Sequence, residues 1–196
     1  MKKIAVFVSG GGTNLQAILD AQSEGKIKSG EVCLVISNRS KAYAIERAKN
    51  AGVPVKVIRK MDCAGQEEFE EKIAEELDKN GIDLIVLAGW LAIFSPAFTK
   101  KYDHRIINVH PSLIPSFCGE GFYGLKVHEE ALKKGVKVTG ATVHYVNEIP
   151  DGGEIIAQKA VRVLPGDTPE RLQKRVMRQA EWKLLPAAIE EICGKM

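Results

Sequence analysis

Asn108 and His110 lie two positions apart in the sequence Ile-Ile-Asn-Val-His at residues 106–110, which Pro111 follows directly. Side chains two apart in a β-strand project from the same face, and proline ends a strand because it has no N–H to donate. An imidazole and an amide on one face can move a proton and donate hydrogen bonds. A lone histidine in an apolar run is ordinarily a core residue, but the neighbouring Asn108 favours a functional pair.

A carboxylate occupies the second candidate position, in the sequence Glu-Ile-Pro-Asp-Gly-Gly at residues 148–153. Gly152 and Gly153 allow a tight turn, which makes Asp151 a loop carboxylate between two β-rich runs. Taken alone, an ordinary Asp-Gly turn is the better interpretation.

A glycine-rich loop, Ser-Gly-Gly-Gly-Thr-Asn at residues 9–14, joins the first apolar run to the first helical pattern. Its glycines let the backbone approach a ligand closely, and the start of the following helix offers free N–H groups to a phosphate. The loop has neither the third glycine of a dinucleotide fingerprint nor the Gly-Lys-Ser/Thr of a P-loop. It therefore favours a single phosphate group over NAD or ATP, with a purely structural turn as the alternative.

These residues depend on elements that the sequence pattern predicts. Short β-rich runs alternate with helical patterns in the first half, while the second half predicts a long hairpin and a final long helix. That helix begins with the N-cap Thr168 and with Pro169 at its first position. The predicted strands are 4–8, 31–37, 55–58, 82–87, 105–109, 138–146 and 154–163, and the predicted helices are 14–23, 41–50, 66–79, 127–134 and 168–193.

Alternation of strands and helices predicts an α/β fold, a doubly wound and mostly parallel sheet with helices on both faces. The hairpin in the C-terminal half is expected to be antiparallel. No linker-like segment divides the sequence, so we expect one domain over residues 1–196. Ligands bind such sheets outside the carboxyl ends of the strands, where the glycine loop and His110 are both expected to lie.

Composition excludes several classes of function. The net charge of +3 is slight and no Lys/Arg run exceeds two residues, so we expect no nucleic-acid partner. No apolar stretch approaches the ~20 residues of a membrane span. The four cysteines form no Cys-x-x-Cys pair, and no Cys/His/carboxylate cluster has metal-ligand spacing, so we expect no metal and a reduced cytoplasmic setting.

Motifs spread over the whole chain resemble those of one family. They are Ser-Gly-Gly-Gly-Thr-Asn-Leu-Gln at 9–16, Leu-Ala-Gly-Trp at 87–90, Asn-Val-His-Pro-Ser-Leu-Ile-Pro at 108–115, and Val-Thr-Gly-Ala-Thr-Val-His-Tyr-Val at 138–146 with Asp-Gly-Gly at 151–153. In this order and spacing they resemble the phosphoribosylglycinamide formyltransferases. The Asn-x-His-Pro-Ser motif and the later Asp-Gly-Gly are similar to those of all 10-formyltetrahydrofolate enzymes of that superfamily, whereas the N-terminal loop is similar to the purine enzymes alone.

The resemblance implies a Rossmann-like formyltransferase fold and transfer of a formyl group from the co-substrate 10-formyltetrahydrofolate to the amine of glycinamide ribonucleotide in purine synthesis. The substrates expected are small molecules, no metal is expected from the spacing of the Cys, His and carboxylate residues, and a homodimer is left open. The implied catalytic residues are Asn108, His110 and Asp151, with the Asp151 charge expected to raise the pKa of His110. The implied phosphate and ribonucleotide ligands are Gly12, Thr13, Asn14 and Glu181, the last with a solvated helix face as the alternative. The implied folate-binding residues are Gln66, Leu91, Ala92, Ile93, Phe94, Asn108, Asn147, Glu148, Ile149, Pro150 and Asp151.

Some positions depart from the family pattern. Ala92 stands where the family commonly has arginine, and Gln66 stands where a basic residue often meets the glutamate tail of the folate. Residues 117–124 form a longer segment than in some members, either a flap over the site or a tolerated surface insertion. His128 and His144 also occur at family-like positions, but we assign neither a catalytic role and expect His144 to be structural.

Two other functions compete with this interpretation. A 10-formyltetrahydrofolate hydrolase shares the Asn-His-Asp set but delivers the formyl group to water, and it usually carries a further regulatory domain that we do not expect in this chain. A non-catalytic phosphate-binding domain would explain the glycine loop but gives no reason for Asn108, His110 and Asp151 to occur together.

Overall fold

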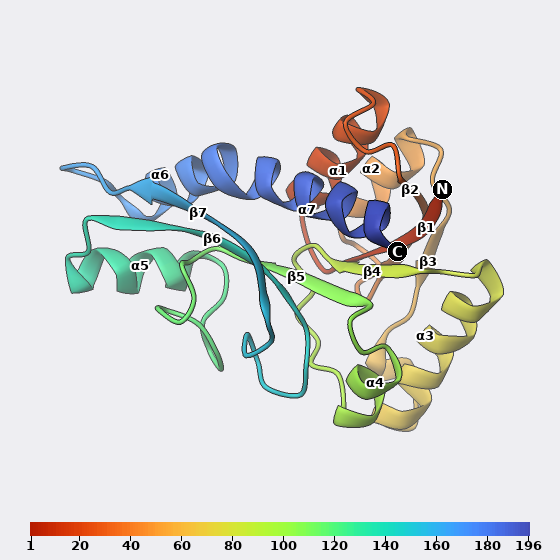
Figure 1. Ribbon diagram of the computed structural model, residues 1–196. Helices are drawn as coiled ribbons and strands as arrows, with labels where there is room; N and C mark the ends of the chain where they lie inside the picture. Colours follow the sequence, from red (N-terminus) through yellow and green to blue (C-terminus); the bar gives the residue numbers. More distant parts are fainter.

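The computed structural model describes residues 1–196 and contains one seven-stranded sheet in the order β3-β2-β1-β4-β5-β6-β7 (Figure 1). The neighbours among the first five strands are parallel, whereas β6 and β7 are antiparallel to theirs. The strands are β1 (Lys2–Val8), β2 (Gly30–Ser37), β3 (Val55–Val57), β4 (Leu84–Leu87), β5 (Ile106–His110), β6 (Val138–Tyr145) and β7 (Ile155–Arg162). The predicted mostly parallel sheet with an antiparallel hairpin is confirmed.

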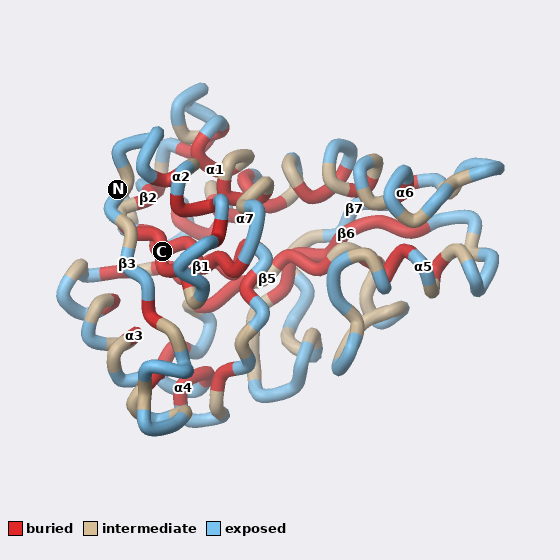
Figure 2. Tube along the Cα trace, turned by 180° about the vertical axis from the view of Figure 1, so that it is seen from behind, coloured by how far each residue is buried: buried red, intermediate tan, exposed pale blue.

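Helices cover both faces of the sheet because its inner strands are apolar on both faces. In β1, Ile4 and Val6 belong to one buried cluster, whereas Ala5 and Phe7 belong to the other. Figure 2 shows these inner strands as the buried centre of the molecule. The first cluster packs under α1 (Thr13–Ser23), α2 (Ala44–Asn50) and the C-terminal helices, and the second under α3 (Gln66–Asn80) and α4 (Pro96–Lys101).

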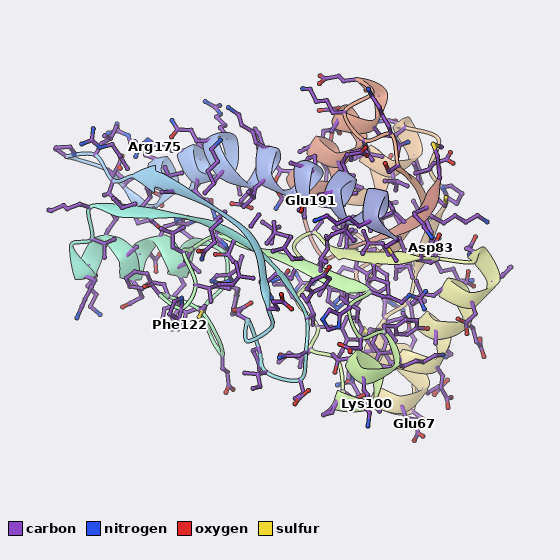
Figure 3. The ribbon with its side chains drawn as sticks, viewed as in Figure 1. Glu67, Asp83, Lys100, Phe122, Arg175 and Glu191 are labelled. Atoms are coloured by element: carbon purple, nitrogen blue, oxygen red, sulfur yellow. The ribbon has the colours of Figure 1, made fainter.

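The C-terminal helix has the predicted extent but contains an unpredicted π-helical turn. It comprises α6 (Pro169–Val176), the π-turn (Met177–Glu181) and α7 (Trp182–Lys195), and α6 contacts α5 (Leu125–Lys134). Thr168 is the predicted N-cap, since its Oγ1 accepts a hydrogen bond from the Arg171 N–H at 3.3 Å. Arg175, labelled in Figure 3, further fixes this start by donating hydrogen bonds to both carboxylate oxygens of Asp167.

Two differences between the predicted and observed helices have identifiable reasons. Helix α2 begins at Ala44 rather than at residue 41, because the Ala44 N–H donates to the Gly10 carbonyl of the glycine loop. Helix α4 was not predicted, although Ser95 caps it and Pro96 begins it, because six residues are too few to show a helical period.

Position 12 favours glycine because of its backbone angle and because of its close contact with α2. Its φ of 71° is left-handed, and a Cβ at this position would lie 2.5 Å from the Cβ of Ala44. We predict that Gly12→Ala lowers the free energy of unfolding by roughly 2–4 kcal/mol, from left-handed strain and overpacking against α2. Urea unfolding measures this. The control is Gly11→Ala, where an added Cβ meets nothing within 4 Å, and equal losses in both variants would contradict the prediction.

Candidate active site

The antiparallel pairing of β5 with β6 gathers four polar side chains. Asn108 lies opposite His144, and His110 lies opposite Thr142. Directly opposed residues share a face of the sheet, as do residues two apart on one strand. The ladder between β6 and β7 shifts register between Val143 and His144, so a bulge occurs beside this cluster, as is common next to active sites.

The turn between β6 and β7 brings Asp151 to these side chains. Its Oδ2 lies 3.4 Å from Nδ1 of His110. Its Oδ1 lies 3.5 Å from Nε2 of His144 and 3.5 Å from Nδ2 of Asn108. Gly153 allows this approach, because a Cβ there would overlap the carbonyl oxygen of Tyr145. The three residues predicted as catalytic therefore converge on one point.

Residues 117–119 cover this cluster from the segment between β5 and α5. The Phe117 carbonyl oxygen lies 2.8 Å from Nε2 of His110, and the Gly119 N–H donates to Oδ2 of Asp151 at 2.9 Å. Phe117 has a left-handed φ of 50°, which is unusual for a bulky residue. Phe122, labelled in Figure 3, belongs to the same segment, and its ring centroid lies 6.5 Å from that of Phe117. In this conformation residues 117–119 lie directly against the cluster.

Burial and charge act against each other on His110 and Asp151. Burial lowers the pKa of His110, and this outweighs the opposite effects of the Asp151 charge and the Phe117 carbonyl. The expected rise in the pKa of His110 is therefore wrong in sign, since His110 is only 4% exposed. Burial raises the pKa of Asp151, but the His144 hydrogen bond, the His110 charge and the Gly119 N–H together lower it by more. The net pKa therefore lies below its ordinary value, and Asp151 is held as the anion.

Three neighbours hold the His144 ring in place. Its Nδ1 lies 2.8 Å from the Tyr145 carbonyl oxygen, which can only accept, so Nδ1 carries a proton. Its Nε2 lies 3.2 Å from Nδ2 of Asn108 and 3.5 Å from Oδ1 of Asp151. His144 thereby orients the Asn108 amide. The expectation that His144 is structural overlooked this contact, because strand pairing across 36 residues is not visible in the local pattern.

A cavity of about 300 Å³ adjoins the cluster at the carboxyl ends of β1, β4 and β5. This volume is at the lower end of the range for small-molecule sites. The predicted phosphate and ribonucleotide residues Gly12, Thr13, Asn14 and Glu181 all line it. Val109 and Pro111, on either side of His110, also line it, so the cavity and the cluster around His110 share one strand end. The other lining residues are Gly10, Gly11, Ala88, Gly89, Gly124, His128, Gln173 and Met177.

Glu181 reaches this cavity from the π-turn. It is 4% exposed, and its Oε2 accepts a hydrogen bond from Nδ2 of Asn14 at 2.8 Å. Burial raises the pKa of Glu181, and the Asn14 amide acts in the opposite direction. The alternative of a solvated helix face is wrong. π-Turns are frequent at functional sites, and this one turns a carboxylate inward toward the glycine loop.

The predicted folate-binding residues fall into two groups. Gln66 contacts the 91–94 segment, since its Nε2 donates to the Ile93 carbonyl at 3.1 Å. The side chains of Leu91 and Ile93 are exposed, and Ala92 is half-buried. Phe94 is buried and stacks on Phe98 at 4.4 Å between ring centroids, so its ring belongs to the core and offers little surface to a ligand.

The second group lies on the turn that carries Asp151. The Asn147 Oδ1 accepts from the Ile149 N–H at 3.0 Å, which shapes the turn, and Glu148, Ile149 and Pro150 are exposed. Asn147 and Glu148 also line a surface pocket of about 440 Å³ beside α4. Asn108 and Asp151 are the only predicted folate residues inside the catalytic cluster.

Neither a metal cluster nor a membrane span is found. No group of three or more His, Cys, Asp or Glu side chains is arranged to hold a metal ion. None of the helices has the length and apolar character required to cross a bilayer.

Comparisons with known proteins agree with this site. The pattern of the formyl transferase family matches residues 2–189. The chloroplastic phosphoribosylglycinamide formyltransferase of Arabidopsis thaliana is 40% identical over 98% of this chain, which spans 65% of that protein's length. The phosphoribosylglycinamide formyltransferase of Haemophilus influenzae is also 40% identical, over 97% of this chain and 86% of its own length.

A solved structure extends the likeness to three dimensions. The crystal structure of glycinamide ribonucleotide transformylase 1 from Symbiobacterium toebii superposes with a TM-score of 0.92 at 42% identity, covering 100% of this chain and 89% of that one. Family pattern, relatives and fold therefore agree, and the chain belongs to the formyl transferase family.

Proposed function

We propose that this chain transfers the formyl group of 10-formyltetrahydrofolate to the amine of 5′-phosphoribosylglycinamide, giving formylglycinamide ribonucleotide and tetrahydrofolate in purine synthesis. One observation carries the proposal: Asn108, His110 and Asp151 converge beside a cavity that begins at a glycine-rich helix start. The relatives that bear this activity in their names support it.

The glycine loop is the proposed phosphate site. Gly12 is the N-cap of α1 and no side chain caps that helix, so its first N–H groups are free for an anion. Thr13 and Asn14 add polar side chains at the same helix start. Glu181 is the proposed partner of a donor group on the ribonucleotide, since a buried carboxylate can only accept hydrogen bonds once it is ionised.

The catalytic cluster supplies the groups that formyl transfer requires. The amine attacks the formyl carbon, a C–N bond forms, and the formyl oxygen gains negative charge. Asn108 donates to that oxygen through Nδ2, and His110 donates once its Nε2 exchanges the Phe117 carbonyl for the substrate oxygen. Asp151 takes the proton of the amine through a water molecule. The oxyanion then re-forms the carbonyl, the bond between the formyl carbon and N10 breaks, and the proton held by Asp151 is delivered to N10.

The folate is proposed to lie between the exposed 91–94 segment and the 147–151 turn. Leu91, Ile93 and Ile149 are 47%, 69% and 58% exposed, so each has apolar surface free to cover a pterin ring. Ala92 and Gln66 carry no charge to bind the folate glutamate tail. Backbone groups of these segments then supply most of the polar contacts.

A transfer assay separates this function from its rivals. Formyl consumption from a 10-formyl folate analogue is followed spectrophotometrically with and without glycinamide ribonucleotide. We expect consumption to require the ribonucleotide. Equal rates with and without it would favour the hydrolase, and folate binding without turnover would favour a non-catalytic domain.

We predict that His110→Ala and Asp151→Asn each lower kcat at least 100-fold, since one donor to a developing oxyanion is typically worth ~3 kcal/mol. Steady-state kinetics with both substrates measures this. Near-wild-type turnover in both variants would refute these catalytic roles.

Gly153→Ala tests the placement of Asp151 without changing the carboxylate. The added Cβ overlaps the Tyr145 carbonyl, so the turn must move away from β6. We predict a loss in kcat of roughly 10- to 100-fold, the usual result of displacing a catalytic group by about 1 Å. Gly194→Ala is the control, because its Cβ makes only an ordinary 3.5 Å contact with Oγ of Ser29. A Gly153→Ala enzyme with unchanged kcat would contradict the geometry.

Glu181→Gln tests the ribonucleotide side of the cavity. Glutamine keeps the shape but removes the charge, so we predict a rise of roughly 10- to 100-fold in KM for the ribonucleotide, as expected for one charged hydrogen bond. The KM for the folate stays unchanged. Glu191→Gln, on the exposed side of α7 and labelled in Figure 3, is the matched control. Equal changes in both KM values would point to general damage instead.

A further inference from the structure

His128 is a buried histidine that the proposed chemistry does not use. It lies on α5, is 0% exposed, and neither Nδ1 nor Nε2 has a hydrogen-bond partner in the protein. The two other buried histidines differ, since His110 and His144 each have partners at both ring nitrogens. A buried polar group without a partner destabilises a fold, so its presence at this position needs another explanation.

The position of His128 supplies that explanation. It lines the same cavity as the glycine loop and Glu181. Gly124, which directly precedes α5, also lines the cavity, and no side chain caps the first turn of this ten-residue helix. A second helix therefore starts at the cavity with free N–H groups, one turn before the His128 imidazole.

Unpartnered buried groups are concentrated around this cavity. Nine buried side-chain nitrogen and oxygen atoms in the chain have no hydrogen-bond partner. Four of them are on cavity-lining residues: Oδ1 of Asn14, Oε1 of Glu181, and both ring nitrogens of His128. Such a concentration indicates a surface whose hydrogen bonds are completed by a ligand.

The charge state of His128 limits what that ligand presents to it. Burial, with a smaller contribution from His110, lowers the pKa of His128 to about 4. The ring is therefore neutral at pH 7, with one donor and one acceptor. A neutral donor–acceptor pair matches a hydroxyl or an amide. A phosphate is an anion and binds better to the free N–H groups of the glycine loop.

We propose that His128 is a substrate-binding residue whose imidazole hydrogen-bonds a ribosyl hydroxyl or the amide of the ribonucleotide. The proposal rests on the proposed function, because it takes the ribonucleotide as the occupant of the cavity. It assigns His128 to a part of the ligand distinct from the phosphate, which lies at the glycine loop.

His128→Leu tests the proposal, since leucine fills a similar volume without hydrogen bonds. We expect KM for glycinamide ribonucleotide to rise at least about 10-fold, the usual effect of one lost hydrogen bond in a dry site. The inhibition constant of inorganic phosphate, as a competitor of the ribonucleotide, stays within about 2-fold, and so does KM for the folate. The melting temperature does not fall, because the protein loses no internal hydrogen bond.

Three further variants complete the test. His128→Gln restores a donor and an acceptor and is expected to recover part of the affinity. His128→Phe keeps a planar ring and replaces the leucine variant if that variant does not fold. Glu129→Gln, the exposed neighbour on α5, is the matched control and is expected to leave every constant unchanged.

The outcomes distinguish this inference from the proposed function. If the wild-type enzyme transfers formyl but His128→Leu leaves the ribonucleotide KM unchanged, the inference is overturned. The proposed function then still holds. If inhibition by inorganic phosphate weakens as much as ribonucleotide binding, His128 contacts the phosphate, and this result also overturns the inference. If the wild type shows no transfer, the proposed function fails, and calorimetric titration of the ribonucleotide onto wild type and His128→Leu still decides whether His128 binds it.

Discussion

The register between β5 and β6 is the constraint on which the candidate site depends. It sets Asn108 opposite His144 and His110 opposite Thr142, on one face of the sheet. A slip of β6 by one residue would turn His144 and Thr142 away from Asn108 and His110. Apolar neighbours such as Val143, which now packs beneath the helices, would take their place. The antiparallel direction of β6 matters equally, because a short turn can then return Asp151 to the strand end from which His110 projects.

The cluster held by this register is buried, and the charges and hydrogen bonds of its groups act against the effect of burial. Withdrawing His110 from water disfavours its cation, and withdrawing Asp151 disfavours its anion. For Asp151 the surrounding donors and the His110 charge outweigh burial, whereas for His110 the Asp151 charge and the Phe117 carbonyl offset burial only in part. The cover segment is thus part of the electrostatics of the cluster, since moving it removes a hydrogen-bond acceptor from His110 and a donor from Asp151 together. A substrate that displaces this segment must supply equivalent hydrogen bonds.

Local patterns predicted most of the fold, and the family resemblance supplied the candidate site residues. The apolar strands, the glycine loop, and the Thr168 cap all leave signals within a few residues of chain. What could not be predicted depends on distant contacts. The His144 contact with Asn108 follows from strand pairing, the inward turn of Glu181 from a π-turn, and the lowered pKa of His110 from burial. Motif spacing gives the residues of a site, but burial and pairing give their charge states.

The two halves of the site differ in how many of their hydrogen bonds the protein itself completes. In the half proposed to be catalytic, His110, His144 and Asp151 all have protein partners, so their positions are set before any substrate arrives. In the cavity, Asn14, Glu181 and His128 each keep at least one buried polar atom without a partner. Preorganised donors stabilise a transition state because they need no rearrangement when charge develops. Unpaired groups do the opposite: they raise the free energy of the empty protein, and a ligand that pairs them gains affinity and specificity together. This division suits the proposed reaction, in which one ribonucleotide is recognised among many phosphates and a small, fixed set of groups carries out the transfer.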